Sequence, residues 1–438
     1  MAVTFGPSRV PARKGHYRWY VLAILTAAQA CHTLDRAIFG LLLESLRHEF
    51  ALSDQQLGLV AGLAYGVAFA VAAVPIGMLV DRANRRNLLA VALTLWSGFT
   101  IICGLTTSFI GLMFSRSAVG AAESAGAPTG LSLLTDHFGA GQRSSAVSIW
   151  YLSSGIGTTL AFIVGGYVIE HHGWRSALLI AGAPGLCIAV LLLLTVSEPL
   201  RGATDAIRQT SLPGSFPSRL RAIAATPGLA HCIAGIILTN VTLSGIGAWM
   251  ASFFVRSHGL SLTQIGIVIA LALGLLGSVG GLFLGFAVDR LDRRRGYHPA
   301  HAAIASAISV LAAAALAAFT LLAPSAGVAI TLFMACGIML TAHFGPANGL
   351  AITLAGSHER GLAVAIVQFG SNLVGFGLGP LIVGVISGHF APQDGVRLGL
   401  LALLAFNVWS AVHFMLSARS VRKDRQGGNL QNREGKVT

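Results

Sequence analysis

The sequence predicts an all-α membrane protein with twelve transmembrane helices arranged as two pseudo-symmetric six-helix halves. Three observations lead to this fold class. Only 10% of the 438 residues are charged, whereas soluble domains carry about 25%. Apolar segments long enough to cross a bilayer, about 20 residues each, recur along the chain. Motifs of the first half return in the second. A chain with so little charge is expected to have lipid as its solvent.

The apolar segments are separated by short polar stretches that hold most of the charged residues. The twelve predicted spans are 19–46, 55–80, 87–107, 109–135, 144–169, 174–197, 228–255, 262–288, 299–322, 325–355, 361–388 and 394–417. The longest polar interruption, rich in proline and arginine, falls between the sixth and seventh spans. We therefore predict a tail at 1–18, an N-terminal half at 19–197, a linker at 198–227, a C-terminal half at 228–418 and a disordered tail at 419–438.

The distribution of Lys and Arg predicts the orientation in the membrane. The four basic residues expected on one side are Arg47, Arg175, Arg256 and Arg397. Arg36 and Arg116 lie within spans, and the rest of the 29 Lys and Arg residues fall on the side of the two tails and the linker. Cytoplasmic loops carry the excess of positive charge, so we expect a multi-pass protein of the cell's inner (plasma) membrane with both termini in the cytoplasm. The net charge of +13 is then a topology signal rather than a sign of nucleic-acid binding.

The two halves share motifs in the same order. Segment 52–58 (LSDQQLG) resembles segment 260–266 (LSLTQIG) at an offset of 208 residues, and segment 77–82 (GMLVDR) matches segment 285–290 (GFAVDR) at the same offset. Arg143, in the loop before the fifth span, is matched by Arg360 at an offset of 217 residues. Parallel repeats of this kind are a known transporter plan, with the substrate site between them.

The repeated Gly-x-x-x-Asp-Arg-x-x-Arg-Arg pattern follows the second and eighth spans. Its glycines allow close helix contact, and its aspartates can cap a neighbouring helix or pair with an arginine. Such contacts can lock one face of the protein shut. The predicted cytoplasmic gate comprises Gly77, Asp81, Arg82, Arg85, Arg143, Asp289 and Arg290. The alternative is a basic loop that only sets topology.

This pattern resembles the signature of the major facilitator superfamily, Gly-x-Leu-Ala-Asp-Arg-x-Gly-Arg-Lys, with Asn84 in place of the loop glycine. The resemblance covers essentially the whole chain. It implies the major facilitator fold and transport by alternating access.

Further segments resemble the spinster branch of that superfamily. They are 32–36 (HTLDR), 116–128 (RSAVGAAESAGAP), 173–175 (GWR), 183–186 (APGL), 198–202 (EPLRG) and 372–380 (NLVGFGLGP). Animal members are associated with export of sphingosine-1-phosphate and lysophospholipids. The resemblance implies functional roles for Asp35 and Arg36, which it places near mid-membrane between the halves, and for Arg116 and Glu123 of the fourth span. One departure weakens an export assignment, because Ala161 and Phe162 replace the Gly-Pro of the antiporter pattern in the fifth span.

Charged residues within spans are costly, at about 2.5–3.5 kcal/mol each on insertion scales, and usually mark transport pathways. The predicted spans hold Asp35, Arg36, Arg116 and Glu123 deep within them. We expect the arginines to attract an anionic head group, and Glu123 or Asp35 to exchange a proton, with Glu123 preferred. The candidate substrate-binding residues are Arg36, Arg116, His32, Phe369 and Asn372. The alternative is a static, fully paired network.

All four charges belong to the first half, so the cavity is expected to be polar on one wall and apolar on the other. This favours a proton-coupled transporter of an amphipathic anionic lipid. The alternative is a proton-coupled transporter of small organic anions or drugs on the same fold. We expect a monomer in contact with membrane lipids, without catalytic residues, cofactor or metal. A receptor or scaffold would need a long soluble segment, and the sequence shows none.

Overall fold

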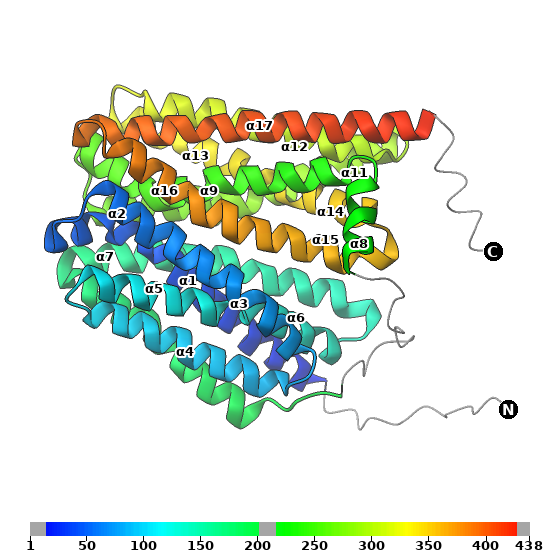
Figure 1. Ribbon diagram of the computed structural model, residues 1–438, viewed down its shortest axis with the longest axis horizontal. Coiled ribbons are helices and arrows are strands. Elements are labelled where there is room, and N and C mark those ends of the chain that lie inside the picture. Colours follow the sequence, from blue (N-terminus) through cyan, green and yellow to red (C-terminus); the bar gives the residue numbers. More distant parts are fainter. Residues whose placement is uncertain (1–14, 201–215, 427–438) are drawn as a thin grey trace.

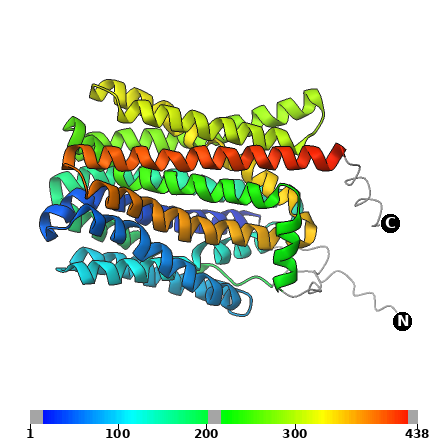
Figure 2. The same cartoon turned by 45° about the horizontal axis from the view of Figure 1, so that its top comes forward.

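The computed structural model describes residues 15–200 and 216–426, and these ranges are helical with no strand. The long helices run side by side along the long axis of the molecule, and one short helix, α8 (Phe216–Ala225), lies across it (Figures 1 and 2). Helix α1 (His16–Phe50) begins and α17 (Pro392–Gln426) ends at the same end of the bundle, which we call the terminal end. The opposite end, where α1 ends and α17 begins, we call the distal end (Figure 1).

The N-terminal half contains six spans. They are α1 (His16–Phe50); α2 (Asp54–Gly58), η1 (Leu59–Leu63) and α3 (Ala64–Val80); α4 (Arg85–Leu105); α5 (Phe109–Glu123) and α6 (Gly126–His137); and α7 (Ala140–Thr195). The last of these contains two spans, because the chain turns at Gly173, where φ is 81° and ψ is 160°.

The C-terminal half repeats this plan after the short helix α8 (Phe216–Ala225). Its spans are α9 (Leu229–His258); α10 (Leu262–Ile269), η2 (Ala270–Leu276) and α11 (Gly277–Arg295); α12 (Pro299–Leu321); α13 (Ala326–Ala342) and α14 (Phe344–Leu354); α15 (Gly356–Gly370), η3 (Ser371–Phe376) and α16 (Gly377–Ser387); and α17 (Pro392–Gln426). The described helices thus account for each predicted span.

By length and composition alone, nine helices in the described ranges could cross a membrane. The difference from twelve has a local cause in each case. The middle of α1 carries Gln29, His32 and the Asp-Arg pair, so its average hydropathy is low. The helix break after Glu123 leaves α5 and α6 too short, and α7 counts once although it contains two spans.

The halves meet where backbones approach closely. A methyl group at Gly62 in the second span would lie 2.6 Å from the carbonyl oxygen of Gly377 in the eleventh. A methyl group at Gly266 in the eighth span would lie 2.2 Å from the carbonyl oxygen of Phe162 in the fifth. Only glycine fits at such contacts. The second, eighth and eleventh spans each contain a π-helical turn, η1, η2 or η3, a feature that is frequent at functional sites.

Two parts of the structure differ from the predicted organisation. Helix α8 forms within the predicted linker, and α17 continues to Gln426, so the first residues of the predicted disordered tail are helical. The remainder of that tail, most of the N-terminal tail and residues 201–215 of the linker lie outside the described residues.

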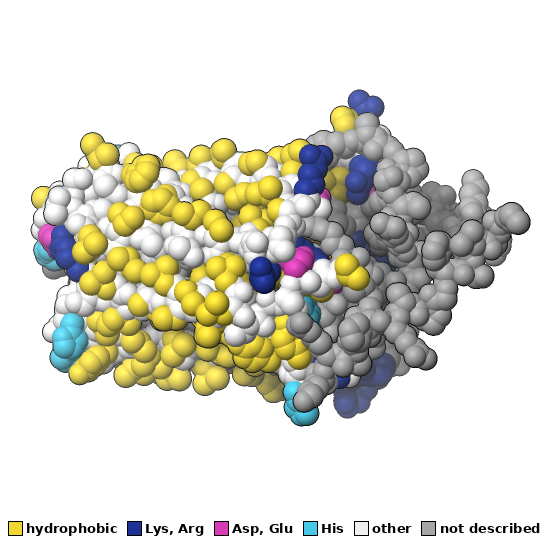
Figure 3. Space-filling view, turned by 90° about the horizontal axis from the view of Figure 1, so that it is seen from below, with side chains coloured by type: hydrophobic (Ala, Val, Ile, Leu, Met, Phe, Trp, Pro, Cys, Tyr) yellow, Lys and Arg dark blue, Asp and Glu magenta, His cyan; other side chains and the backbone are white. Residues whose placement is uncertain are grey.

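The outer surface is apolar over most of its length. In the view of Figure 3, apolar side chains cover the middle of the molecule and charged side chains lie near its two ends. Large exposed side chains include Ile110, Phe283 and Leu194. An apolar surface this broad does not face water, so the chain is a multi-pass membrane protein.

Candidate functional site

Two carboxyl groups meet inside the N-terminal half. Asp35 and Glu123 are almost fully buried, with 2% and 1% of their surfaces exposed. The Thr100 hydroxyl donates to Asp35 Oδ2 at 2.5 Å. The Tyr65 hydroxyl donates to Glu123 Oε2, and His32 Nε2 lies 3.2 Å from the same oxygen. The two carboxyl groups also interact with each other. Four helices, α1, α3, α4 and α5, therefore build this carboxyl pair.

Local sequence explains why these side chains converge. His32, Asp35 and Arg36 lie within about one helical turn near the middle of α1. Helix α5 ends at Glu123, and α6 begins at Gly126. Pro128 has no N–H to donate to the carbonyl four residues earlier, so the fourth span breaks here. The break leaves Glu123 at the C-terminal end of α5, facing α1.

Two arginines lie beside the carboxyl pair. Arg36 Nη2 donates to Asn372 Oδ1 at 2.8 Å, and its guanidinium lies 3.3 Å from the ring centroid of Phe376. Both partners belong to η3, so Arg36 connects the two halves. The Arg116 guanidinium lies 4.3 Å from the ring centroid of Phe39. Contacts with aromatic faces stabilise a desolvated cation without neutralising its charge.

The polar groups at this site are not all paired. The Nε atoms of Arg36 and Arg116 are buried and make no hydrogen bond to the described protein. Asp35 Oδ1 and Glu123 Oε1 are buried without a donor from another side chain, and the two carboxyl groups interact with each other. Most buried polar atoms in proteins have a partner. The two arginines can therefore take an anionic ligand, and the carboxyl pair can hold a proton. Within the described ranges, no three His, Cys, Asp or Glu side chains group as metal ligands.

The structure brings together most of the candidate substrate-binding residues. His32, Arg36, Arg116 and Asn372 surround or adjoin the carboxyl pair. Phe369 does not fill the expected place, because it is 42% exposed and the ring on Arg36 is that of Phe376, two turns further on. The functional roles of these residues remain predictions.

Sequence reasoning did not find the aromatic and hydroxyl side chains of the site. These are Phe39, Tyr65, Thr100 and Phe376. The available signal was weak, since a hydroxyl or an aromatic ring in an apolar span is common. Their link to the charged residues appears only when α3, α4 and η3 are placed beside α1 and α5.

A cluster of charged side chains joins the halves at the distal end, and we call it the distal clamp. Arg256 on α9 donates to Glu44 Oε1 at 2.9 Å and to both oxygens of Asp54 at 2.7 and 2.9 Å. Ser387 donates to Asp54 Oδ2 at 2.5 Å. Arg256 and Ser387 belong to the C-terminal half, whereas Glu44 and Asp54 belong to the N-terminal half. Bidentate arginine–carboxylate contacts are strong and directional.

At the terminal end, the two glycines of the repeated motif form no close contact with the described part of the chain. No atom lies within 4 Å of where a Cβ would stand at Gly77 or Gly285, so the expected close helix contacts at these glycines are absent here. Asp81, Arg82, Asp289 and Arg290 are exposed, and Arg143 is half-buried. These contacts are absent because the two halves approach each other closely toward the distal end, where the distal clamp joins them.

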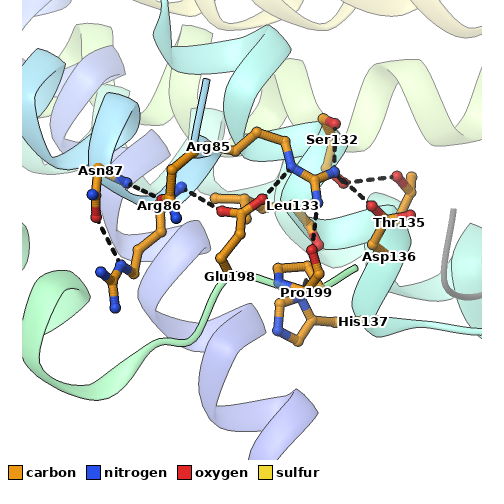
Figure 4. A network of polar contacts seen from close by, with 11 residues as sticks. Arg85, Arg86, Asn87, Ser132, Leu133, Thr135, Asp136, His137, Glu198 and Pro199 are labelled. Carbon is orange, nitrogen blue, oxygen red and sulfur yellow. Dashed lines mark hydrogen bonds and ion pairs between the residues drawn. The ribbon is translucent and has the colours of Figure 1, made fainter. Parts of the chain in front are cut away.

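Arg85 is the exception within the motif. It is 2% exposed and binds two neighbouring segments of its own half, α6 and the stretch that follows α7 (Figure 4). Its Nε donates to Glu198 Oε1 at 2.8 Å, its Nη1 to Asp136 Oδ2 at 2.5 Å and to Ser132, and its Nη2 to the Pro199 carbonyl at 3.1 Å. Arg85 therefore ties the terminal ends of the third, fourth and sixth spans together.

Residues 25–380 match the family model of the Major Facilitator Superfamily. The chain belongs to this superfamily. An MFS-type efflux pump of Mycolicibacterium smegmatis is 25% identical over 413 residues, which cover 93% of this chain and 94% of that protein. Human protein spinster homolog 1 is 29% identical over 249 residues, which cover 54% of this chain and 46% of that protein.

Solved structures share the fold. A bacterial homolog to the human lysosomal transporter Spinster, in an inward-facing and unoccupied conformation, superposes with a TM-score of 0.83 at 24% identity. The match covers 94% of this chain and 99% of that chain. The likeness shows the major facilitator fold. Together with the family match and the curated relatives, it supports the predicted spinster resemblance and indicates a membrane transporter.

Proposed function

We propose that the protein is a proton-coupled, alternating-access transporter of an amphipathic anionic substrate, of the lysophospholipid or sphingosine-1-phosphate type. One observation carries the proposal: a buried carboxyl pair lies beside two buried or half-buried arginines, and each arginine keeps an unpaired Nε. The similarity to protein spinster homolog 1 supports the spinster type of transporter.

The carboxyl pair supplies the proton site. Two carboxylates at close quarters in a low-dielectric interior disfavour double ionisation, so the pair holds a proton in at least one state. Asp35 and Glu123 then titrate as one unit. Thr100, Tyr65 and His32 hold their orientation. A change in water access between conformations would load or unload this proton.

The arginines supply the anion site. Arg36 and Arg116 each rest on an aromatic ring, so their charge stays available to a phosphate or carboxylate head group. The spans of the C-terminal half carry no Asp, Glu, Lys or Arg at this depth. The head group would meet the N-terminal half, and an apolar tail would meet the other wall.

The structure supports one state of the transport cycle. The distal clamp is closed, and in the described ranges the motif glycines Gly77 and Gly285 at the terminal end have no close contact. With the termini in the cytoplasm, as the basic residues predict, this state is open toward the cytoplasm and closed toward the outside.

A second candidate is transport of small organic anions. The probable galactarate/D-glucarate transporter GudP of Bacillus subtilis is 23% identical over 307 residues, which cover 64% of this chain and 67% of that protein. The same arginines would bind a sugar diacid. This candidate differs from the first in having no need of an apolar wall.

Transport in proteoliposomes with an imposed pH gradient tests proton coupling. We expect Glu123→Gln and Asp35→Asn to abolish accumulation driven by the gradient while downhill exchange persists. Asp394→Asn is the matched control, because Asp394 is exposed at the distal end and should retain wild-type coupling. Full gradient dependence in both site variants would refute coupling through this pair.

Binding to purified protein, read as thermal stabilisation, separates the two substrate classes. We expect lysophosphatidylglycerol to stabilise the wild type, and Arg36→Gln or Arg116→Gln to weaken the apparent affinity at least tenfold, whereas Arg397→Gln should not. Stabilisation by D-glucarate with none by the lysolipid would select the organic-anion candidate. Equal affinity in the arginine variants would contradict the head-group role.

A further inference from the structure

Tyr65 touches both the proton site and the anion site. Its hydroxyl donates to Glu123 Oε2. The guanidinium groups of Arg36 and Arg116 lie 5.0 and 5.2 Å from the centroid of its ring. No other residue in the described ranges combines a hydrogen bond to the carboxyl pair with ring contacts to both arginines.

The backbone holds this tyrosine firmly. Tyr65 is the second residue of α3, which follows the π-helical turn η1, and it is 2% exposed. A methyl group at Gly120 of α5 would lie 2.5 Å from the Tyr65 carbonyl oxygen, so α3 and α5 touch through their backbones here. The ring is therefore fixed at its base, while its hydroxyl end reaches the carboxyl group.

We propose that Tyr65 is the positioning residue that links anion binding to protonation of the carboxyl pair. The inference rests on the proposed function and deepens it by naming the link between its two sites. An anionic head group that binds Arg36 or Arg116 competes with the aromatic face for the cation. When the arginine moves away from the Tyr65 ring, the ring contacts relax. This alters the hydrogen bond that the Tyr65 hydroxyl donates to Glu123. A donor hydrogen bond favours the ionised carboxylate, so its gain or loss changes proton occupancy.

The groups that face Tyr65 are consistent with this role. The charged groups acting on it are Arg36, Arg116 and Glu123, with His32 and Asp35 next to Glu123. The remaining ring neighbour is Phe69, at 6.0 Å between centroids. If Tyr65 only filled space, its ring would be required but its hydroxyl would not. Removing the hydroxyl alone therefore tests the proposal.

Thermodynamic linkage between protonation and substrate binding gives a quantity that can be measured, the change of substrate affinity with pH. If protonation changes substrate affinity by some factor, substrate changes proton affinity by the same factor. Affinity of the purified full-length protein for lysophosphatidylglycerol is measured at pH 5.5 and pH 8, together with proton uptake or release on binding in weak buffer. We expect the wild type to show about a tenfold affinity difference, within the usual range of coupling.

Three variants separate the hydroxyl from the ring. Tyr65→Phe keeps the ring contacts and loses the hydrogen bond. We expect its affinity to be close to that of the wild type at one of the two pH values and to differ less than twofold between pH 5.5 and pH 8. Binding should be accompanied by no proton release or uptake. Tyr65→Leu should lose affinity as well. Phe39→Leu removes the other ring on Arg116, and it should weaken binding while keeping the pH dependence. Phe69→Leu is the control for packing beside Tyr65, with unchanged pH dependence expected.

The outcomes distinguish this inference from the proposed function. If Glu123→Gln abolishes the pH dependence but Tyr65→Phe preserves it, the tyrosine link is wrong and proton coupling stands. If the wild type itself shows no pH-dependent binding of the lysolipid or of D-glucarate, both are wrong. Size-exclusion profiles and melting temperatures of Tyr65→Phe and Phe69→Leu confirm that each variant is folded.

Discussion

Buried arginines in this protein differ in how completely they are paired. Arg85 uses its Nε and both terminal nitrogens on Glu198, Asp136 and the Pro199 carbonyl. Arg36 and Arg116 keep a buried Nε without a partner. A fully paired arginine fixes structure, whereas an incompletely paired one retains the capacity to bind. The alternative of a static, fully paired network therefore describes Arg85 better than the carboxyl site.

Removing Arg85 should destabilise the N-terminal half. Arg85→Gln leaves Asp136 and Glu198 without their guanidinium partner, and breaking a buried pair costs about 3–5 kcal/mol. Asp136 is nearly buried, but the Glu198 side chain is 22% exposed, so we expect the lower part of that range. The measurement is the free energy of unfolding in mild detergent. Asn87→Ala, at an exposed neighbour, should change it by less than about 1 kcal/mol; similar losses in both variants would contradict the role of Arg85.

The charged residues of the site were predictable because charge is rare in an apolar span. Asp35, Arg36, Arg116 and Glu123 needed no structure to be singled out. Phe376 was missed for a geometric reason. It lies two helical turns from Phe369, and which of the two rings contacts Arg36 depends on how the two halves pack. Tyr65 was missed because its hydroxyl finds Glu123 through tertiary packing.

Helix ends form the contacts that close the distal end. Ser387, at the end of α16, reaches Asp54 at the start of α2. Glu170, near the end of the fifth span, accepts a hydrogen bond from the backbone N–H of Thr263 at the start of α10, at 2.7 Å. Glu170 and Ser387 are separated by the repeat offset of 217 residues, so the duplicated frame places a side chain from each half on the first turn of the other half. An acidic side chain there also complements the helix dipole.

The distal clamp should control which side of the transporter is open. Arg256→Gln removes the bidentate contact with Asp54 and the bond to Glu44, so the closed distal end loses stabilisation. We expect the population to move toward a distal-open state, seen by spin-label distance measurements between the halves at that end. Glu49→Gln is the matched control, since Glu49 pairs with Arg175 within one half. An unchanged distance distribution in Arg256→Gln would contradict the clamp.

The turn at Gly173 separates two spans that the helix α7 otherwise joins. Its φ of 81° and ψ of 160° are almost restricted to glycine, and another residue there costs about 1–3 kcal/mol. Gly173→Ala should lower the melting temperature, whereas Gly98→Ala should not, because Gly98 is helical and a methyl group added there would have no other atom within 4 Å. Equal melting temperatures would mean that the turn relaxes without strain.

At the scale of the whole molecule, the two similar halves differ in the charged residues that they contribute. The predicted spans and repeats came from composition and pattern, because lipid requires long apolar helices and a duplicated chain keeps its motifs. The state of the bundle could not be predicted in this way, because it depends on contacts between the halves. The distal clamp pairs Arg256 with Asp54 across the halves, yet the repeat places Leu262 at the position equivalent to Asp54, so the closure is as asymmetric as the carboxyl site.

The orientation decides what the closed distal end means for transport. Arg82 and Arg290 mark the terminal end, and Arg397 lies at the distal end. The excess of basic residues at the terminal end predicts that it faces the cytoplasm. In a variant with its native cysteines replaced, a membrane-impermeant maleimide should label Arg397→Cys in intact cells, and Arg82→Cys or Arg290→Cys only after permeabilisation. The reverse pattern would invert the topology. The structure would then be closed toward the cytoplasm and open toward the outside, and the proton exchange that we propose for the carboxyl pair would take place on the opposite side.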